Sequence, residues 1–289
     1  MAERALLIVN PAARKRHAED GDLAECVRLL TAAGFDIDRR ETGTDGPTSA
    51  DLAKTAIAEG FRVVLVAGGD GTVAPAAIAL LESDVTLGIL PFGSYMNIAN
   101  GLGIPLTPID AARVIAERKV KRSDVGEVAG EVFFETCGIG IDADMFGAAR
   151  LAERGRWGRA FRRIVRWATA NSHRVEITVD GRTERHRVLQ ILVVNSPYYG
   201  WGMPIVPNAD MTDGELDVAI FPRKGRLELI AWMARIWHTG RPGKPPRVLR
   251  GKVIEIASSE AVSVHADGQI AGRLPVTVRC CEGALRVFA

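Results

Sequence analysis

Apolar and polar positions alternate along the first 120 residues with two periods, one typical of buried strands and the other of covering helices. Continuous apolar runs predict strands at Ala5–Val9, Phe35–Arg39, Val85–Leu90 and in the run that starts at Phe61. Amphipathic stretches predict helices over Asp22–Ala33, Ser49–Glu59 and Val73–Leu81, and a further helix starts at Thr107-Pro108. This alternation predicts an α/β domain with a parallel sheet covered on both faces.

The pattern changes near Ser123, where short strands joined by turn residues replace the alternation. Strands are predicted within 125–141 and at Val175–Val179, Val188–Val194, Leu216–Phe221, Val253–Ala257, Val262–His265, Val276–Cys280 and Leu285–Phe288. Asp180-Gly181 and Asp267-Gly268 are typical hairpin turns. We therefore expect an α/β domain over 1–124 and a mainly β sandwich or partly closed barrel over 125–289, with a last strand free to return to the first domain. Helical inserts are expected near 146–171 and 225–238.

Charge and cysteine content narrow the classes of protein that fit. Residues 1–125 hold 14 Lys and Arg against 17 Asp and Glu, and residues 126–289 hold 23 against 18, so the second half suits an anionic surface better. The four cysteines have neither zinc-site nor disulfide spacing, which favours the cytoplasm. The N-terminal apolar run predicts a buried strand rather than a signal peptide, and no run approaches the ~20 residues of a membrane span.

The segment Phe61–Thr72, FRVVLVAGGDGT, predicts a strand that ends in a glycine turn directly before a helix. Glycine N–H groups turned outward, together with the unpaired N–H groups and positive dipole of a helix start, form a cradle for phosphate. Asp70 in such a cradle repels phosphate unless a divalent cation or a reacting hydroxyl lies between them. The alternative is a strand-to-helix turn in which Asp70 only caps a helix.

Further segments complete a pattern in a fixed order along the chain. They are Asn10-Pro11, LPFGSYMNIA (Leu90–Ala99), CGIGIDADM (Cys137–Met145), PNADMTDGELDV (Pro207–Val218) and ADGQ (Ala266–Gln269). Together with GGDGT, they resemble the diacylglycerol and sphingoid lipid kinase family, specifically its soluble bacterial members. The resemblance implies a Rossmann-like, NAD kinase-like ATP-binding domain and a β-sandwich domain with the active site between them. It also implies Mg²⁺-dependent transfer of the ATP γ-phosphate to a lipid hydroxyl.

The resemblance carries individual residues into the site. The nucleotide-contacting positions are Asn10, Thr42, Gly68, Gly69, Asp70, Gly71, Thr72, Gly93 and Ser94. Asp213 matches the aspartate of a structural magnesium site, which also takes backbone carbonyl oxygens at the positions of Asp210 and Glu215. Asp267 begins the catalytic segment, which in the family reads Asp-Gly-Glu.

The chain departs from the family pattern at several of these positions. Met96 and Asn97 stand where the family often has Asn-Asp, and Ala74-Pro75 stands where it often has Asn-Glu. Gln269 replaces the glutamate of the catalytic segment, and an amide cannot accept a proton as a general base. We therefore assign the catalytic role to Asp267 or Asp70.

Simpler structural roles compete with these assignments. Asp267-Gly268 and Asp213-Gly214 are also ordinary hairpin signals, and Asp124 can be a loop cap at the start of a strand. The insert at 150–174 carries eight arginines against Glu153, with aromatic residues at helical spacing. It fits a helix on an anionic membrane surface as well as an amphipathic helix packed on the β domain. For the insert near 225–238 we favour plain core packing.

The sequence thus predicts an ATP- and Mg²⁺-dependent lipid kinase that acts on diacylglycerol or a related lipid at the cytoplasmic membrane face. An NAD kinase-like phosphotransferase is a second enzyme hypothesis, because it shares the glycine loop and the two-domain plan. A lipid- or nucleotide-binding regulatory relative with little turnover is a third, motivated by Pro75, Met96, Asn97 and Gln269. No nucleic-acid partner is expected, and the choice between monomer and homodimer is open.

Overall fold

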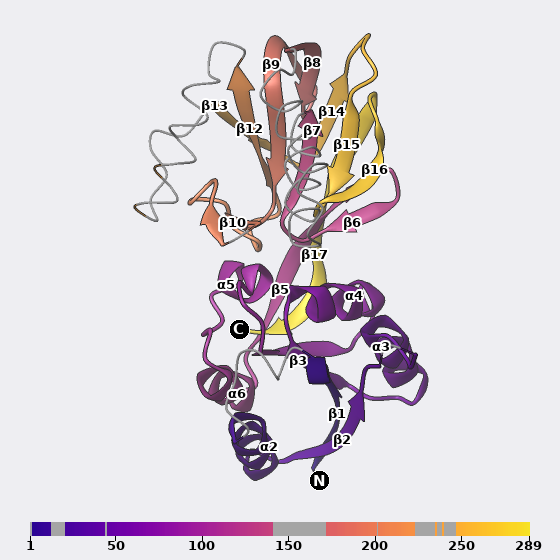
Figure 1. Cartoon of the computed structure of the whole chain (residues 1–289), viewed down its shortest axis with the longest axis vertical. Helices are drawn as coiled ribbons and strands as arrows, with labels where there is room; N and C mark the ends of the chain where they lie inside the picture. Colours follow the sequence, from indigo (N-terminus) through magenta and orange to yellow (C-terminus); the bar gives the residue numbers. More distant parts are fainter. Residues whose placement is uncertain are drawn as a thin grey trace, which may run out of the picture.

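The computed structural model describes residues 2–12, 21–43, 45–140, 172–200, 202–222, 235, 239 and 247–289. Figure 1 shows two lobes, a lower one with the helices and an upper one made of strands. Two long strands, β5 (Val120–Val128) and β17 (Val276–Phe288), run between the lobes. The arginine-rich insert up to residue 171 and nearly all of the insert near 225–238 lie outside the described residues.

The first lobe is an α/β layer structure around a parallel sheet. Its strands are β1 (Glu3–Val9), β2 (Phe35–Glu41), β3 (Val63–Gly68) and β4 (Thr86–Pro91), in the order β4-β3-β1-β2. Its helices are α2 (Asp22–Ala32), α3 (Ser49–Ala58), α4 (Asp70–Leu80), α5 (Asn97–Gly101) and α6 (Pro108–Ala116). The parallel sheet and its helices confirm the fold class predicted for the N-terminal half.

Successive residues of each strand pack into two separate hydrophobic cores, because strand side chains point alternately to the two faces of the sheet. Leu6 and Ile8 of β1 pack in one cluster with residues of α3 and α4. Ala5 and Leu7 of the same strand pack in another with residues of α2 and α6. Both faces are therefore buried, which explains why these strands read as continuous apolar runs.

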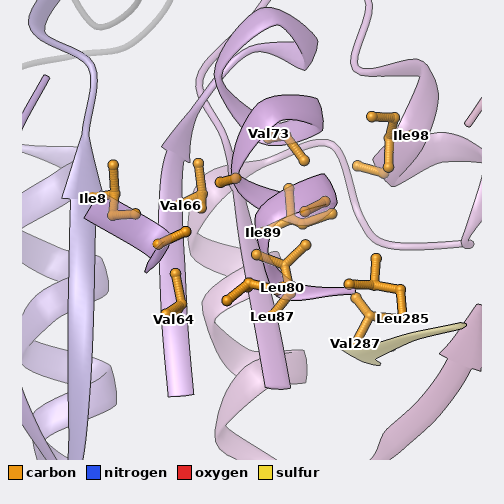
Figure 2. Close-up of a cluster of buried hydrophobic side chains, with 14 of the residues drawn as sticks. Ile8, Val64, Val66, Val73, Leu80, Leu87, Ile89, Ile98, Leu285 and Val287 are labelled. Carbon is orange, nitrogen blue, oxygen red and sulfur yellow. The ribbon is translucent and has the colours of Figure 1, made fainter. Parts of the chain in front are cut away.

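The last strand of the chain contributes to the core of the first lobe. Leu285 and Val287 of β17 are fully buried beside Leu80 and Leu87, as Figure 2 shows. The end of β17 pairs in parallel with β4, and most of β17 pairs antiparallel with β5. The sequence predicted two strands here; the structure has one strand with an irregularity in its pairing between Cys281 and Leu285.

The second lobe is mainly β structure, as predicted. Its strands are β6 (Glu131–Phe133), β7 (Thr136–Gly140), β8 (His173–Val179), β9 (Arg182–Val194), β10 (Tyr198–Tyr199), β11 (Met203–Pro204), β12 (Leu216–Pro222), β13 (Arg247–Gly251), β14 (Val253–Ala257), β15 (Ser263–Ala266) and β16 (Gln269–Arg273). The main sheet runs in the order β16-β15-β7-β9-β8-β14-β17, with antiparallel neighbours. β9 starts six residues before the predicted strand, because its first half alternates charged residues toward solvent.

Candidate active site

The glycine segment forms a sharp turn from β3 into α4. β3 ends at Gly68, Gly69 has an extended backbone at the N-cap position, and α4 already begins at Asp70. The sequence placed this helix start at Val73; the structure corrects it, since Asp70, Gly71 and Thr72 form the first helical turn. The N–H of Thr72 donates to the carbonyl of Gly69 at 2.8 Å, and the start of α4 carries the positive end of the helix dipole.

Close backbone contact fixes the glycine turn against the loop that follows β4. A Cβ atom on Gly93 would lie 2.4 Å from the Cα of Gly69 and 2.8 Å from the sulfur of Met96. Gly71 is different, because a Cβ atom there would meet none of the described residues within 4 Å. Gly69 and Gly93 therefore pack two loops together, whereas Gly71 faces open space at the start of the helix.

The other predicted nucleotide contacts lie at the same edge of the sheet. β1, β2, β3 and β4 end at residues 9, 41, 68 and 91, and Asn10, Thr42 and Ser94 follow three of these ends. The Asn10 side-chain amide donates to the Thr72 hydroxyl oxygen at 2.8 Å, and the Thr42 N–H donates to the carbonyl of Val9 at 2.9 Å. Ligands of open α/β sheets bind at the carboxyl ends of the strands, so these residues occupy the expected edge.

Asp70 caps a helix, but not the helix that it starts. Its two carboxylate oxygens accept hydrogen bonds from the N–H groups of Asn97 at 3.0 Å and Ile98 at 3.2 Å. These are the first residues of α5, and Met96 before them has a left-handed backbone with φ of 51°. Burial raises the pKa of Asp70, and the N–H donors oppose that rise. The glycine turn is thus tied to the Met96–Asn97 loop through this carboxylate.

Asp267 holds a turn in the second lobe by three backbone hydrogen bonds. Its carboxylate accepts from the N–H groups of Phe134 at 2.8 Å, Glu135 at 3.0 Å and Thr136 at 2.9 Å. Burial raises the pKa of Asp267 to about 6 even though these donors lower it, and the charge of Asp70 adds to the rise. Asp267 and Gly268 have φ values of 43° and 74°, as the predicted hairpin turn requires.

Glu135 is a site residue that the sequence analysis missed. Its Oε2 accepts hydrogen bonds from the side-chain amide of Asn97 at 2.9 Å and from the N–H of Gly200 at 3.3 Å. Burial raises the pKa of Glu135 well above its usual range, and the charges of Asp267 and Asp70 raise it further. Three carboxylates, 65 and 132 residues apart in sequence, are therefore linked by hydrogen bonds: Asp267 accepts the N–H of Glu135, Glu135 accepts the amide of Asn97, and Asp70 accepts the N–H of Asn97. The only sequence signal is an isolated charge in the apolar run VFFETCGIG.

In the predicted cation site, the Asp213 carboxylate forms an ion pair with an arginine. Arg250 lies 3.1 Å from the Asp213 carboxylate, and its guanidinium donates to both oxygens of Asp217 at 3.1 Å. Asp210 accepts the N–H and hydroxyl of Thr212, and Glu215 lies 3.9 Å from Arg250. No cluster of three or more His, Cys, Asp or Glu side chains with metal-site geometry occurs among the described residues. Asp210, Asp213 and Glu215 remain a prediction.

Asp124 anchors the same turn to the long strands. Its carboxylate accepts hydrogen bonds from the N–H groups of Gly214 at 2.7 Å and Gly283 at 2.6 Å. Burial raises its pKa, and the charges of Asp213 and Glu282 add to that rise. Asp124 is therefore a loop cap, as the simpler interpretation of its sequence position held.

A magnesium titration of thermal unfolding tests whether the Asp213 turn also takes a divalent cation. We expect MgCl₂ to raise the Tm of the parent and to have no effect on the Tm of Asp213→Ala, because hard cations need carboxylate oxygens. Arg250→Met should cost about 1–3 kcal/mol of unfolding free energy, since it leaves a nearly buried Asp217 carboxylate without its donor. A parent whose Tm ignores MgCl₂ would contradict the cation prediction and leave Arg250 as the positive partner of this turn.

Two protein-family models match the chain, one over each lobe. The diacylglycerol kinase catalytic domain matches residues 4–128, and the YegS C-terminal NAD kinase beta sandwich-like domain matches residues 140–289. A probable lipid kinase YegS-like of Pseudomonas fluorescens is 28% identical over 295 residues, which covers 99% of this chain and 96% of the relative. A diacylglycerol kinase of Mycobacterium tuberculosis is 28% identical, with 85% of this chain and 82% of the relative covered.

Solved structures show the same two-lobed fold. The crystal structure of a putative diacylglycerol kinase from Bacillus anthracis superposes with a TM-score of 0.77 at 27% identity, covering 99% of this chain and 97% of that one. Among the helices that the structure describes, none has the length and apolar character of a membrane span. The chain belongs to the diacylglycerol kinase-like lipid kinases, with a diacylglycerol kinase catalytic domain followed by a YegS-type C-terminal domain.

Proposed function

We propose that this protein transfers the γ-phosphate of ATP, in the presence of Mg²⁺, to a hydroxyl of diacylglycerol or a related lipid. The observation that carries the proposal is the chain of hydrogen bonds that links Asp70, in the glycine turn, through Asn97 and Glu135 to Asp267 of the second lobe. A phosphate cradle and carboxylates from the second lobe are the two parts that phosphoryl transfer to an alcohol requires.

The first lobe supplies the nucleotide side of the proposed site. Asn10, Thr42, Gly68, Gly69, Gly71, Thr72, Gly93 and Ser94 would hold the ATP phosphates with N–H and hydroxyl groups at the carboxyl edge of the sheet. The open space at Gly71 fits a phosphate at the start of α4. Bound Mg²⁺ would neutralise charge on the phosphate oxygens, and it needs only one or two protein carboxylates. These residues fit ATP, and Asp70 offers the carboxylate nearest to the cradle.

The second lobe supplies the acceptor side. A lipid hydroxyl is a poor nucleophile at neutral pH, so it must be held in line with the γ-phosphate and lose its proton. Carboxylates between the lobes can accept that proton, whereas a dinucleotide acceptor would need donors for its own phosphates. Similarity of the C-terminal domain to an NAD kinase β sandwich keeps NAD as the acceptor to exclude by experiment.

A transfer assay with several acceptors tests the proposal. The purified protein, γ-³²P-ATP and MgCl₂ are incubated with mixed micelles of diacylglycerol, other glycerolipids or sphingoid bases, and with NAD in a parallel reaction. We expect label in the lipid extract and none in NAD. Label in NAD alone would favour the NAD kinase-like hypothesis, and ATP binding without any transfer would favour a regulatory relative.

Contact with an anionic membrane surface is a further part of the proposal. It rests on the arginine-rich segment, whose residues 150–171 lie outside the described residues, while Arg174 belongs to β8. We expect sedimentation with vesicles to rise with their anionic lipid content and to fall with salt, because screening shortens to ~8 Å at physiological ionic strength. Replacing Arg159, Arg162, Arg163 and Arg166 by Gln should remove most of that binding and leave ATP affinity unchanged. Equal vesicle binding by variant and parent would refute the membrane role of this segment.

A further inference from the structure

We propose that Glu135 is the general base, whose Oε1 receives the proton of the lipid hydroxyl. This proposal rests on the lipid kinase function proposed above. It assigns the proton to a residue other than Asp70 and Asp267, the two candidates that the sequence indicated.

The carboxylates of Asp70 and Asp267 are already committed to backbone donors. Each oxygen of Asp70 accepts one N–H at the start of α5. Asp267 accepts one N–H at Oδ2 and two at Oδ1, all from the turn 134–136. These hydrogen bonds stabilise the ionised form and oppose the rise in pKa that burial causes at both carboxyl groups. Moving either carboxylate toward a substrate would also release the loop that it holds.

Glu135 differs, because only one of its two carboxylate oxygens accepts hydrogen bonds from the described residues. Both hydrogen bonds to its carboxylate, from Asn97 and Gly200, end on Oε2. Within the described part of the chain, Oε1 accepts no hydrogen bond, and it is not among the solvent-excluded polar atoms that lack a partner. Oε1 is therefore the carboxylate oxygen that remains open to a substrate proton.

The surroundings hold this side chain in one position at the junction of the lobes. Asp267 fixes the backbone of Glu135, and Asn97 from the first lobe fixes its carboxylate while donating also to the carbonyl of Gly200 at 2.9 Å. Asn97 also donates its backbone N–H to Asp70, so this one residue links Glu135 to the carboxylate of the glycine turn. A carboxylate at position 97 would repel Glu135, which gives this asparagine a physical reason.

In the proposed step, transfer of the hydroxyl proton accompanies transfer of the phosphoryl group. The hydroxyl oxygen forms a bond to the γ-phosphorus of ATP, and its proton moves to Oε1 of Glu135. The bond between the γ-phosphorus and its bridging oxygen breaks, and the electron pair leaves with ADP. Glu135 then releases the proton to solvent. Burial and the charges of Asp267 and Asp70 raise the pKa of Glu135 well above its usual range, which makes its carboxylate a stronger proton acceptor.

Glu135→Gln tests this assignment, with Glu131→Gln as the matched control. Gln keeps an oxygen for Asn97 and Gly200 but cannot accept a proton. Glu131 lies exposed on the neighbouring strand β6, so the same change there should leave kcat unaltered. We expect Glu135→Gln to lower kcat by roughly 10²–10⁴-fold, with KM for ATP and Tm close to parent values. The pH profile should change too: parent kcat falls as pH drops through the pKa of Glu135, and the residual activity of the variant should lack that acidic limb.

The possible results separate this proposal from the function on which it rests. Glu135→Gln with parent-like kcat would overturn the base assignment alone. So would a lower kcat that comes with weakened ATP binding, a lower Tm and an intact acidic limb, since that set marks a structural role. A parent that transfers phosphate to no lipid would overturn the proposed function and the assignment together.

Discussion

Asp267→Asn should lower kcat for lipid phosphorylation by roughly 10²-fold, because it displaces Glu135, and also reduce the free energy of unfolding by about 1–3 kcal/mol. Three N–H groups point at the Asp267 carboxylate, and an asparagine would turn its NH₂ group toward at least one of them. The turn that carries Glu135 would then shift. Steady-state kinetics on micelles and chemical denaturation measure the two effects.

Asp180→Asn is a matched control for this variant. Asp180 begins another Asp-Gly hairpin turn with φ of 46°, and its carboxylate accepts the N–H groups of Lys252 and Val253. It lies at the β8–β9 turn, on a different hairpin from the site. A similar loss of stability with full activity is expected for Asp180→Asn. If Asp267→Asn is destabilised but fully active, Asp267 is only a turn former.

The raised pKa of Asp267 also predicts a pH effect on stability. A carboxyl group with a folded pKa of about 6 and an unfolded pKa near 3.9 binds its proton more tightly in the folded state. Its stabilising contribution is complete below the unfolded pKa and is lost as pH rises through about 6. The difference in unfolding free energy between parent and Asp267→Asn should therefore shrink over this window as pH rises.

Gly93→Ala and Gly71→Ala should separate loop packing from phosphate binding. A methyl group on Gly93 collides with the Gly69 backbone, so we expect a stability loss of about 1–3 kcal/mol and loss of ATP binding. A methyl group on Gly71 meets no atom within 4 Å in the part of the chain that the structure describes, and alanine favours helix, so stability should hold or rise by up to about 1 kcal/mol. That methyl group would fill the phosphate space, so ATP affinity should fall about tenfold or more.

Gly21→Ala is the control for the Gly71 change. A methyl group on Gly21 would also meet no atom of the described residues within 4 Å, and Gly21 stands at the start of another helix, α2. Calorimetric titration with ATP and thermal melts of the variants give both quantities. Gly71→Ala with parent-like ATP affinity would contradict phosphate binding at the start of α4.

Local patterns in the sequence were sufficient for most of the fold. The buried strands of the first lobe are apolar on both faces, and the Asp-Gly turns have the positive φ values that those residue pairs favour. Patterns failed where tertiary contacts decide the structure. The first half of β9 is rich in charged residues, so the apolar pattern did not predict it as a strand. Three residues between Cys281 and Leu285 interrupt the apolar pattern of β17, so one strand was predicted as two.

The site was predictable in its parts but not in its arrangement. The glycine turn follows from spacing, and Asp267 follows from its place in a recognisable segment. The duties of the carboxylates depend on which N–H groups face them, and those belong to residues 27 to 133 positions away. Glu135 gains its importance from Asn97 and Gly200, which no local pattern brings to it.

Under the proposed function, the phosphate goes from ATP to a lipid hydroxyl. The most direct measurement is partition of γ-³²P label between organic and aqueous phases after incubation with diacylglycerol micelles, with Gly71→Ala and Glu135→Gln in parallel. We expect time-dependent label in the organic phase for the parent, at a much lower rate for both variants. Label that stays in the aqueous phase for every lipid, while the parent binds ATP, would contradict phosphate transfer to a lipid hydroxyl.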